Sequence, residues 1–241
     1  MDKLDRHEIL SRVAAGTITP EEAASQLDSL KGGEATAQPA IRKVRIARQL
    51  GSIEITGDPT VRDAVAEGPH RARIDGDTMV FEGEVWEETG SFVFGFARGA
   101  ANEKLSIRLN PSLGLDLDVQ AGNCRVRGVE GPIRADIQAG SATIEGFRSE
   151  LNLTVQAGSV KASGRLAGGD SRITCDAGNV NLNLEPGSSV RIKAHTTIGK
   201  VDLPGQVRIN GRGTAEDVTI GDATGLLVIE ANMGSVRVTA A

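Results

Sequence analysis

Three carboxylates, Asp116, Asp118 and Asp136, come nearest in this sequence to a catalytic pattern. Asp118 and Asp136 are 18 residues apart, and equivalent positions of an 18-residue repeat would lie side by side. Paired carboxylates cleave glycosidic bonds when they flank a cleft, with aromatic residues that grip the sugar. The neighbouring positions carry Gln, Thr and Arg and form no aromatic column. We therefore expect a solvated strand surface here and no enzyme.

Other residues that could do chemistry are too dispersed to form a site. His7, His70 and His195 are far apart in the sequence, and none has the spacing of a metal ligand. The sequence has no G-x-S-x-G elbow, P-loop, dinucleotide fingerprint or C-x-x-C motif. Cys124 and Cys175 occupy different phases of the repeat described below, so we expect two buried thiols and no disulfide. The sequence predicts no catalytic residue, metal, cofactor or small-molecule substrate.

A short repeated phrase organises most of the chain. Its four copies are Val119–Gly122, Ile137–Gly140, Val155–Gly158 and the drifted Cys175–Gly178, and their glycines are spaced by 18, 18 and 20 residues. A fixed period of this length is typical of stacked repeats.

Apolar residues alternate with polar ones on both sides of each glycine. In the first copy, Leu115, Leu117 and Val119 precede the glycine, and Cys124 and Val126 follow it. This period of two predicts half-buried strands joined by a tight turn at the glycine. Continued up to the glycine, the alternation places the alanine of each phrase on the inner side.

The repeat predicts a mainly β fold, a parallel β-solenoid or β-helix-like stack of rungs of about 18–20 residues. Stacking makes Arg127 and Glu145 neighbours. It also predicts an outward ladder of hydrogen-bonded side chains, formed by Gln120, Gln138, Gln156 and Asp176.

Weaker copies extend this domain to residues 41–241. They surround Gly51, Gly199 and Gly234, and residues 207–220 are expected to supply one more rung. The regular repeat lapses between residues 58 and 111.

The irregular section contains five of the six aromatic residues of the chain: Phe81, Trp86, Phe92, Phe94 and Phe96. They could close the end of the core with bulky side chains. Alternatively, they could form an exposed patch for a protein partner or the membrane interface. The last four are candidate partner-binding residues.

The first 30 residues differ from the rest of the chain. Their apolar spacing predicts a two-helix hairpin, with Gly16 ending the first helix and Thr19–Glu22 capping the second. Residues 31–40 have the composition of a flexible linker. The hairpin could cap the β domain or act as a docking or dimerisation element. Its candidate partner-binding residues are Ile9, Leu10, Val13, Leu27 and Leu30.

Composition limits the remaining function classes. The 241 residues carry a formal charge of -5, which argues against a nucleic-acid binder. The basic cluster of residues 42–45 with Arg48 is expected on a solvated strand face. The charged N-terminus and the lack of a long apolar run predict a cytoplasmic protein that is at most peripheral at the inner face of the membrane.

Residues 8–24 resemble the short helical (SHOCT-like) domain that precedes bacterial toast-rack proteins, and the Gln-Ala-Gly-Ser/Asn rungs resemble the toast-rack, or putative-adhesin, repeat itself. The resemblance implies a non-enzymatic scaffold or sensor in envelope-stress systems of the Lia and phage-shock kind. It transfers no catalytic residue, and it implies that any membrane contact is indirect.

We therefore expect an interaction protein that binds a protein partner or self-associates through residues 1–30. Two other classes stay open. One is a carbohydrate-binding or carbohydrate-active β-helix, and the other is a filament-forming solenoid of the bactofilin kind.

Overall fold

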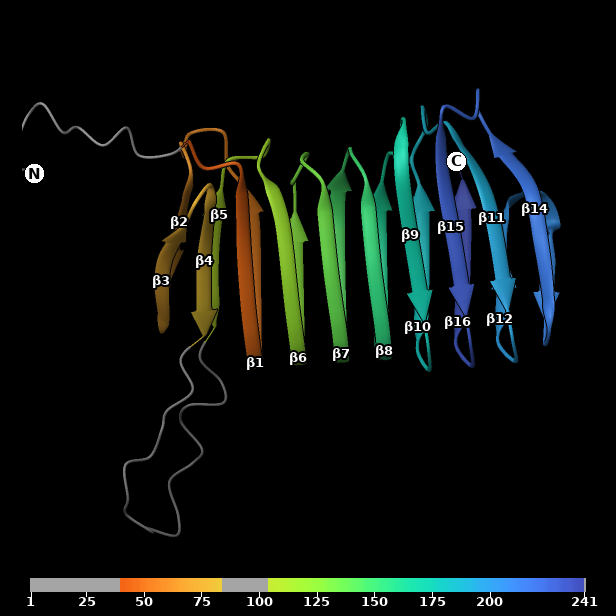
Figure 1. Ribbon diagram of the computed structural model, residues 1–241, viewed down its shortest axis with the longest axis horizontal. Helices are drawn as coiled ribbons and strands as arrows, with labels where there is room; N and C mark the ends of the chain where they lie inside the picture. Colours follow the sequence, from red (N-terminus) through yellow and green to blue (C-terminus); the bar gives the residue numbers. More distant parts are fainter. Residues whose placement is uncertain (1–39, 84–103, 241) are drawn as a thin grey trace, which may run out of the picture. The chain divides into compact units, whose positions relative to one another are not determined.

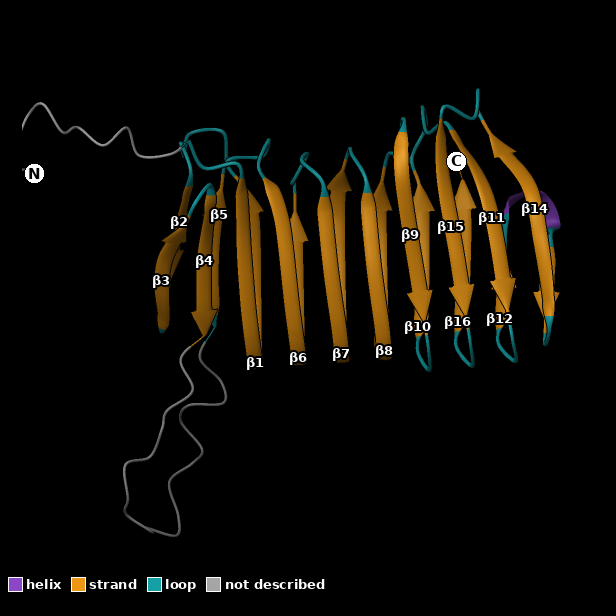
Figure 2. Cartoon of the chain, in the orientation of Figure 1, coloured by secondary structure: helices purple, strands orange, loops and turns teal. Residues whose placement is uncertain are grey.

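The computed structural model describes residues 40–83 and 104–240. The β elements belong to one compact unit, Ile41–Ala241. Apart from the 3-10 turn η2 (Pro204–Gln206), every described element is a β-strand (Figure 2). The predicted mainly β fold is confirmed for this unit, while the predicted two-helix segment lies outside the described residues.

The strands follow in chain order: β1 (Lys43–Gly57), β2 (Ala64–Glu67), β3 (His70–Asp75), β4 (Thr78–Gly83), β5 (Leu105–Leu109), β6 (Gly114–Arg127), β7 (Ile133–Phe147), β8 (Leu151–Gly164), β9 (Gly169–Cys175), β10 (Asn179–Leu184), β11 (Val190–Thr196), β12 (Lys200–Asp202), β13 (Arg208–Asn210), β14 (Gly213–Ile220), β15 (Gly225–Ala231) and β16 (Ser235–Ala240).

Each long strand bends at the repeated glycine. In β6, Leu117 and Val119 are buried before the bend and Cys124 and Val126 after it, so the buried phase shifts by one residue at Gly122. The two halves therefore belong to two layers that run in opposite directions (Figure 1). We call the layer formed before the bend sheet I and the layer formed after it sheet II.

The glycine is required where successive bends touch. Gly122 has φ +146°, and a Cβ added there would lie 2.0 Å from the carbonyl oxygen of Gly51. Gly140 has φ +121°, and its Cβ would lie 2.1 Å from the oxygen of Gly122. Only a residue without a side chain fits this conformation and this backbone contact.

One bent unit is one rung of the stack. Neighbouring rungs pair in parallel, and Gly122 pairs with Gly140, which pairs with Gly158. The 18-residue period is therefore the length of a rung. As predicted, Arg127 lies beside Glu145, with 3.0 Å between Nε and Oε2.

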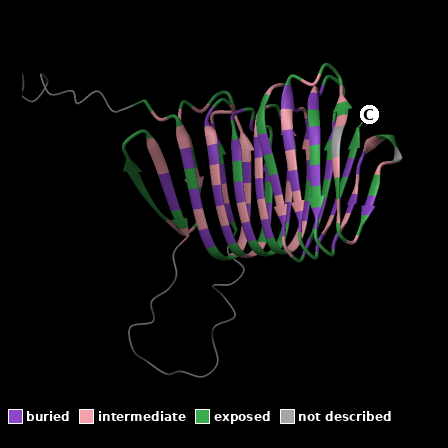
Figure 3. Ribbon diagram, turned by 45° about the vertical axis from the view of Figure 1, so that its right-hand side comes forward, coloured by how far each residue is buried: buried purple, intermediate pink, exposed green. Residues whose placement is uncertain are grey.

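The core lies between the two sheets. Buried and outward positions alternate along most strands (Figure 3). Cys124 and Cys175 are buried free thiols, as predicted.

The residue before the glycine points outward, contrary to the prediction from alternation. Ala139 and Ala157 are exposed, and the larger residues at the same position, Leu50, Met233 and Ile198, are 66%, 66% and 70% exposed. The reason is that the chain turns the corner here, so alternation stops before the glycine and resumes after it.

The rungs do not follow chain order at the C-terminal end. β15 pairs with β9 on one side and β11 on the other, and β16 likewise lies between β10 and β12. The last rung of the sequence is thus inserted between the two rungs that precede it. A simple solenoid, in which spatial order follows chain order throughout, is not what the structure shows.

A similar insertion occurs at the other end. β1 lies between β6 on one side and a rung formed by β4 and β5 on the other. The section from 58 to 111, irregular in sequence, therefore supplies a further rung from residues 78–83 and 105–109.

Antiparallel strands close both ends of the stack. β3 and β2 pair with β4 and β5, and β14 and β13 pair with β11 and β12. The rung expected from residues 207–220 is instead this second pair of capping strands. β3 exposes Arg71, Arg73 and Asp75 at its edge, and charged edge strands oppose the addition of further strands.

Arg48 is an exception to its predicted exposure. It pairs with Val119 and so occupies a core column, where it is 8% exposed. Its Nε donates a hydrogen bond to the carbonyl oxygen of Leu50 at 2.7 Å. The bend at Gly51 supplies this acceptor, which sequence alternation could not reveal.

Candidate functional site

The predicted partner-binding residues lie outside the described residues; they are Ile9, Leu10, Val13, Leu27, Leu30, Trp86, Phe92, Phe94 and Phe96. Phe81 of the same aromatic section is described and is 3% exposed. Its ring meets the ring of His70 edge to face, with 5.5 Å between the centroids. Phe81 is therefore a core residue.

The three carboxylates of sheet I lie as their spacing predicts. Asp118 pairs with Asp136 on neighbouring strands. Asp116 forms an ion pair with Lys43 at 2.9 Å, and Asp136 lies 3.5 Å from Arg134. Cations on an open strand surface thus accompany two of the carboxylates, which agrees with a solvated face.

The other candidate groups do not assemble into a site. His195 is exposed on β11, and Nδ1 of His70 lies 2.7 Å from the oxygen of Gly68. In the described ranges, no group of His, Cys, Asp and Glu side chains could hold a metal ion. Burial raises the pKa of the Cys124 thiol to about 12, and it also raises the pKa of Cys175. Both thiols are therefore poor nucleophiles.

No helix in the described part of the chain is both long and apolar enough to span a membrane.

The predicted glutamine ladder is not formed. Gln120, Gln138 and Gln156 are exposed at the outer corner of the bend, and no side-chain hydrogen bond joins them within the described residues. Two shorter pairs at the same edge do form. Asn232 donates to Asp176 at 2.6 Å, and Ser141 donates to Asn123 at 2.7 Å.

The most distinctive surface is the outer side of sheet II. Its polar side chains form straight rows across the strands, because every rung is in register. The middle row consists of the residues three positions after each bend glycine. In spatial order it contains Glu54, Arg125, Thr143, Lys161, Asn181, Arg237 and Asp202.

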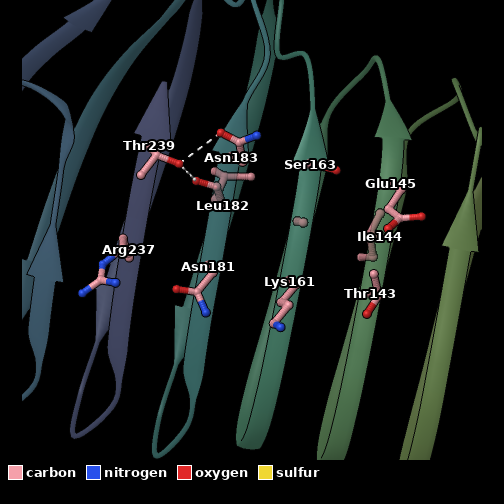
Figure 4. Close-up of a pocket in the computed structure, with 11 residues that line it drawn as sticks. Thr143, Ile144, Glu145, Lys161, Ser163, Asn181, Leu182, Asn183, Arg237 and Thr239 are labelled. Carbon is pink, nitrogen blue, oxygen red and sulfur yellow. Dashed lines mark hydrogen bonds between the residues drawn. The ribbon is translucent and has the colours of Figure 1, made fainter. Parts of the chain in front are cut away.

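Two shallow grooves run along the middle row. One, of about 320 Å³, is lined by Thr143, Lys161, Asn181 and Arg237 together with a parallel row that includes Ser163, and Figure 4 shows these side chains side by side. The other, of about 500 Å³, is lined by residues that include Arg125 and again Thr143. Because Thr143 lines both grooves, the surface is continuous across these rungs.

Cations outnumber carboxylates on sheet II. The outward cations are Lys104, Arg108, Arg125, Arg127, Lys161, Lys200, Arg208 and Arg237, against Glu54, Glu67, Glu145 and Asp202. Among the described residues, Arg125 and Lys161 have no carboxylate within ion-pair distance. This positive surface belongs to a chain whose formal charge is -5.

Each carboxylate of sheet II is neutralised by cations. The hydrogen bond from Lys104 holds the pKa of Glu54 below its usual value, with a further contribution from the Lys104 charge. Desolvation opposes ionisation of Asp202, but hydrogen bonds from Arg208, Arg237 and Lys200 outweigh it and lower the pKa. Arg237 shares Asp202 with two other cations, at an Nη2–Oδ2 distance of 3.3 Å, so the local charge stays positive.

The middle row was not identified as a site from the sequence. The signal was present, since Arg125, Lys161 and Arg237 each stand three residues after a repeat glycine. The sequence does not reveal that Arg237 lies next to Asn181, because this depends on the order of the rungs in space. The arrangement offers charge and hydrogen-bonding groups on a rigid frame.

No protein-family model matches the sequence, and no curated protein matches it. A "putative cell adhesion protein" from Clostridium sporogenes ATCC 15579 is 14% identical, with a TM-score of 0.44 over 85% of this chain and 96% of that one. A "putative adhesin" from Bacteroides fragilis NCTC 9343 is 11% identical, with a TM-score of 0.27 over 83% of this chain and 92% of that one.

Proposed function

We propose that this protein is a non-enzymatic interaction scaffold that presents the outer face of sheet II to a protein partner. The observation that carries the proposal is the middle row, in which neither Arg125 nor Lys161 has a carboxylate within ion-pair distance among the described residues. Lys161 lies between the neutral Thr143 and Asn181, and Arg125 lies between Glu54 and Thr143. Unpaired cations at fixed spacing on a rigid sheet favour recognition of a complementary acidic surface.

The geometry favours this function over the two alternatives. A carbohydrate-cleaving enzyme needs two carboxylates across a cleft, whereas Asp116 and Asp136 of sheet I lie on an open face beside cations. A filament needs stack ends that continue the parallel ladder. Here antiparallel strands cover both ends, and β3 adds a charged edge.

The proposal includes a link to the bacterial envelope-stress response, which rests on the resemblance to toast-rack proteins. It also includes a second contact, partner binding or self-association, through residues 1–30. The N-terminal segment would then tether the scaffold while sheet II binds the partner.

A blocking substitution tests the role of sheet II. Ser163 and Thr154 both lie on β8 and are half-buried, but Ser163 faces outward from sheet II and Thr154 from sheet I. Ser163→Trp should abolish recovery of bound protein from extracts of the source cells, and Thr154→Trp should leave it intact. Circular dichroism of both variants checks that they fold. Equal recovery by the two variants would show that sheet II is not the binding surface.

A further inference from the structure

We propose that the middle row of sheet II binds an acidic peptide segment in the polyproline II conformation, with an acidic residue at every third position. This inference rests on the proposed function and specifies the partner's chemistry. It is carried by the spacing of Arg125, Lys161 and Arg237.

The three cations lie on alternate rungs. Thr143 separates Arg125 from Lys161, and Asn181 separates Lys161 from Arg237, in direct register. Strands in a sheet are about 4.8 Å apart, so successive cations are about 9.6 Å apart along a straight line. Figure 4 shows Thr143, Lys161, Asn181 and Arg237 in this row.

This spacing selects among peptide conformations. A polyproline II helix rises about 3.1 Å per residue with three residues per turn, so every third side chain faces the same way at about 9.3 Å intervals. In a β-strand, side chains on one face recur at about 6.7 Å or 13 Å. In an α-helix, positions i and i+7 are about 10.5 Å apart. From Arg125 to Lys161 and on to Arg237, the side-chain spacing of the polyproline II helix matches the spacing of the cations most closely.

The neutral residues of the row suit the same conformation. A polyproline II backbone has no internal hydrogen bonds, so its carbonyl groups are free to accept them. The hydroxyl of Thr143 and the side-chain amide of Asn181 can donate to such carbonyls between the acidic positions. An α-helix would offer neither residue a free backbone group along most of its length.

The ends of the row limit the length of the segment. Glu54 precedes Arg125, and Asp202 follows Arg237. Two rungs beyond Arg125 the row carries Ser106, which offers no cation to a further acidic residue. Two rungs beyond Arg237 it carries Arg208, whose guanidinium is already paired with Asp202 at 2.8 Å. The row therefore fits three acidic residues, with the pattern acidic-x-x-acidic-x-x-acidic.

A single-stranded nucleic acid is a less suitable occupant. Such strands are usually bound by aromatic side chains that stack on bases, and no aromatic residue lines either groove. The formal charge of -5 also weakens a general attraction for phosphates.

Two fluorescent peptides of equal composition test the spacing. One is Glu-Pro-Pro-Glu-Pro-Pro-Glu, and the other, Glu-Glu-Glu-Pro-Pro-Pro-Pro, carries the same charge in one block. Fluorescence anisotropy at low salt should show tighter binding of the spaced peptide to the full chain. Equal affinities would overturn the proposal, as would tighter binding of a helical peptide with glutamates seven residues apart, of oligo-dT or of hyaluronan.

Single substitutions locate the site. Lys161→Gln and Arg125→Gln should each weaken binding of the spaced peptide by about two- to fivefold, the range of one exposed ion pair. The matched control is Lys193→Gln, which removes an exposed cation from β11 of sheet I and should not change the affinity. An equal loss in the control would indicate unspecific attraction and overturn the proposal.

An exchange of two neighbours separates spacing from charge. Combining Thr143→Lys with Lys161→Thr preserves composition and net charge but moves the central cation by one rung. The preference for the spaced peptide should disappear, and an unchanged preference would refute the spacing argument. If Ser163→Trp abolishes protein recovery while neither glutamate peptide binds, only this inference fails and the interaction function stands.

Discussion

Asn232 donates a hydrogen bond to Asp176, with 2.6 Å between Nδ2 and Oδ1, although 56 residues separate them in the sequence. The contact joins the last rung to β9–β10, its neighbour in space. The same rung pairs on its other side with β11 and β12. The C-terminal residues are therefore an internal layer of the stack.

A chain that ends at Thr224 should consequently lose cooperative folding. Without β15 and β16, the β9–β10 and β11–β12 rungs each lose a parallel neighbour, and their ladder hydrogen bonds and apolar contacts are interrupted. Thermal unfolding followed by circular dichroism should show a broad transition far below that of the full chain. In a stack ordered by sequence, the same truncation would remove one terminal rung. Stability would then fall only by the contribution of that rung and its single interface. A sharp transition that is only slightly lowered would contradict the observed order.

Gly140→Ala should destabilise the protein by more than the about 1–3 kcal/mol of ordinary overpacking. The added Cβ would meet the backbone oxygen of Gly122 at 2.1 Å, in a conformation with φ +121°. Urea unfolding measures the loss.

The matched control is Gly76→Ala, at φ +60° in an open turn with nothing within 4 Å of the added Cβ. It should cost only the about 1–2 kcal/mol of left-handed backbone strain. Similar decreases in the free energy of unfolding for both variants would show that the backbone contact at the bend does not require glycine.

Stability should fall in alkaline solution because of the buried thiol of Cys124. Burial raises its pKa from 9.0 to about 12, so the folded state keeps a proton that the unfolded chain releases. The stability that the protonated Cys124 thiol contributes is fully present below pH 9.0 and is lost as the pH rises toward about 12. Over this range the free energy of unfolding falls by about 1.4 kcal/mol per pH unit. Urea unfolding at pH values from about 8 to about 11 under reducing conditions measures how steeply the free energy of unfolding falls with pH. This range begins below the unfolded-state pKa of 9.0.

Cys124→Ala is the control, since the paired residue on the next rung is Ala142. The variant should show a shallower alkaline loss. A residual slope is expected because burial also raises the pKa of Cys175. An unchanged slope in the variant would rule out Cys124 as the cause.

The sequence predicts the inside of each rung well and its corner poorly. Alternation identifies Leu117 and Val126 as core residues because a strand exposes one face to each side. It fails at Ala139 and Arg48, because the reversal at the glycine turns the alanine outward and supplies a carbonyl acceptor to a buried guanidinium. These outcomes depend on three-dimensional geometry at the bend.

The sequence by itself determined which residues of different rungs occupy equivalent positions. Counting three residues from each glycine assigns Arg125, Lys161 and Arg237 to one row, because stacked rungs repeat the same local geometry. Only the tertiary structure decided the order of that row. In chain order Asp202 would follow Asn181, but Arg237 takes this place and completes the alternate-rung spacing of cations. The physical reason is that backbone hydrogen bonds between parallel strands are the same for any sequence, so the repeat does not say which rungs become neighbours. The long-range fit of the side chains and the reach of the connecting segments decide that.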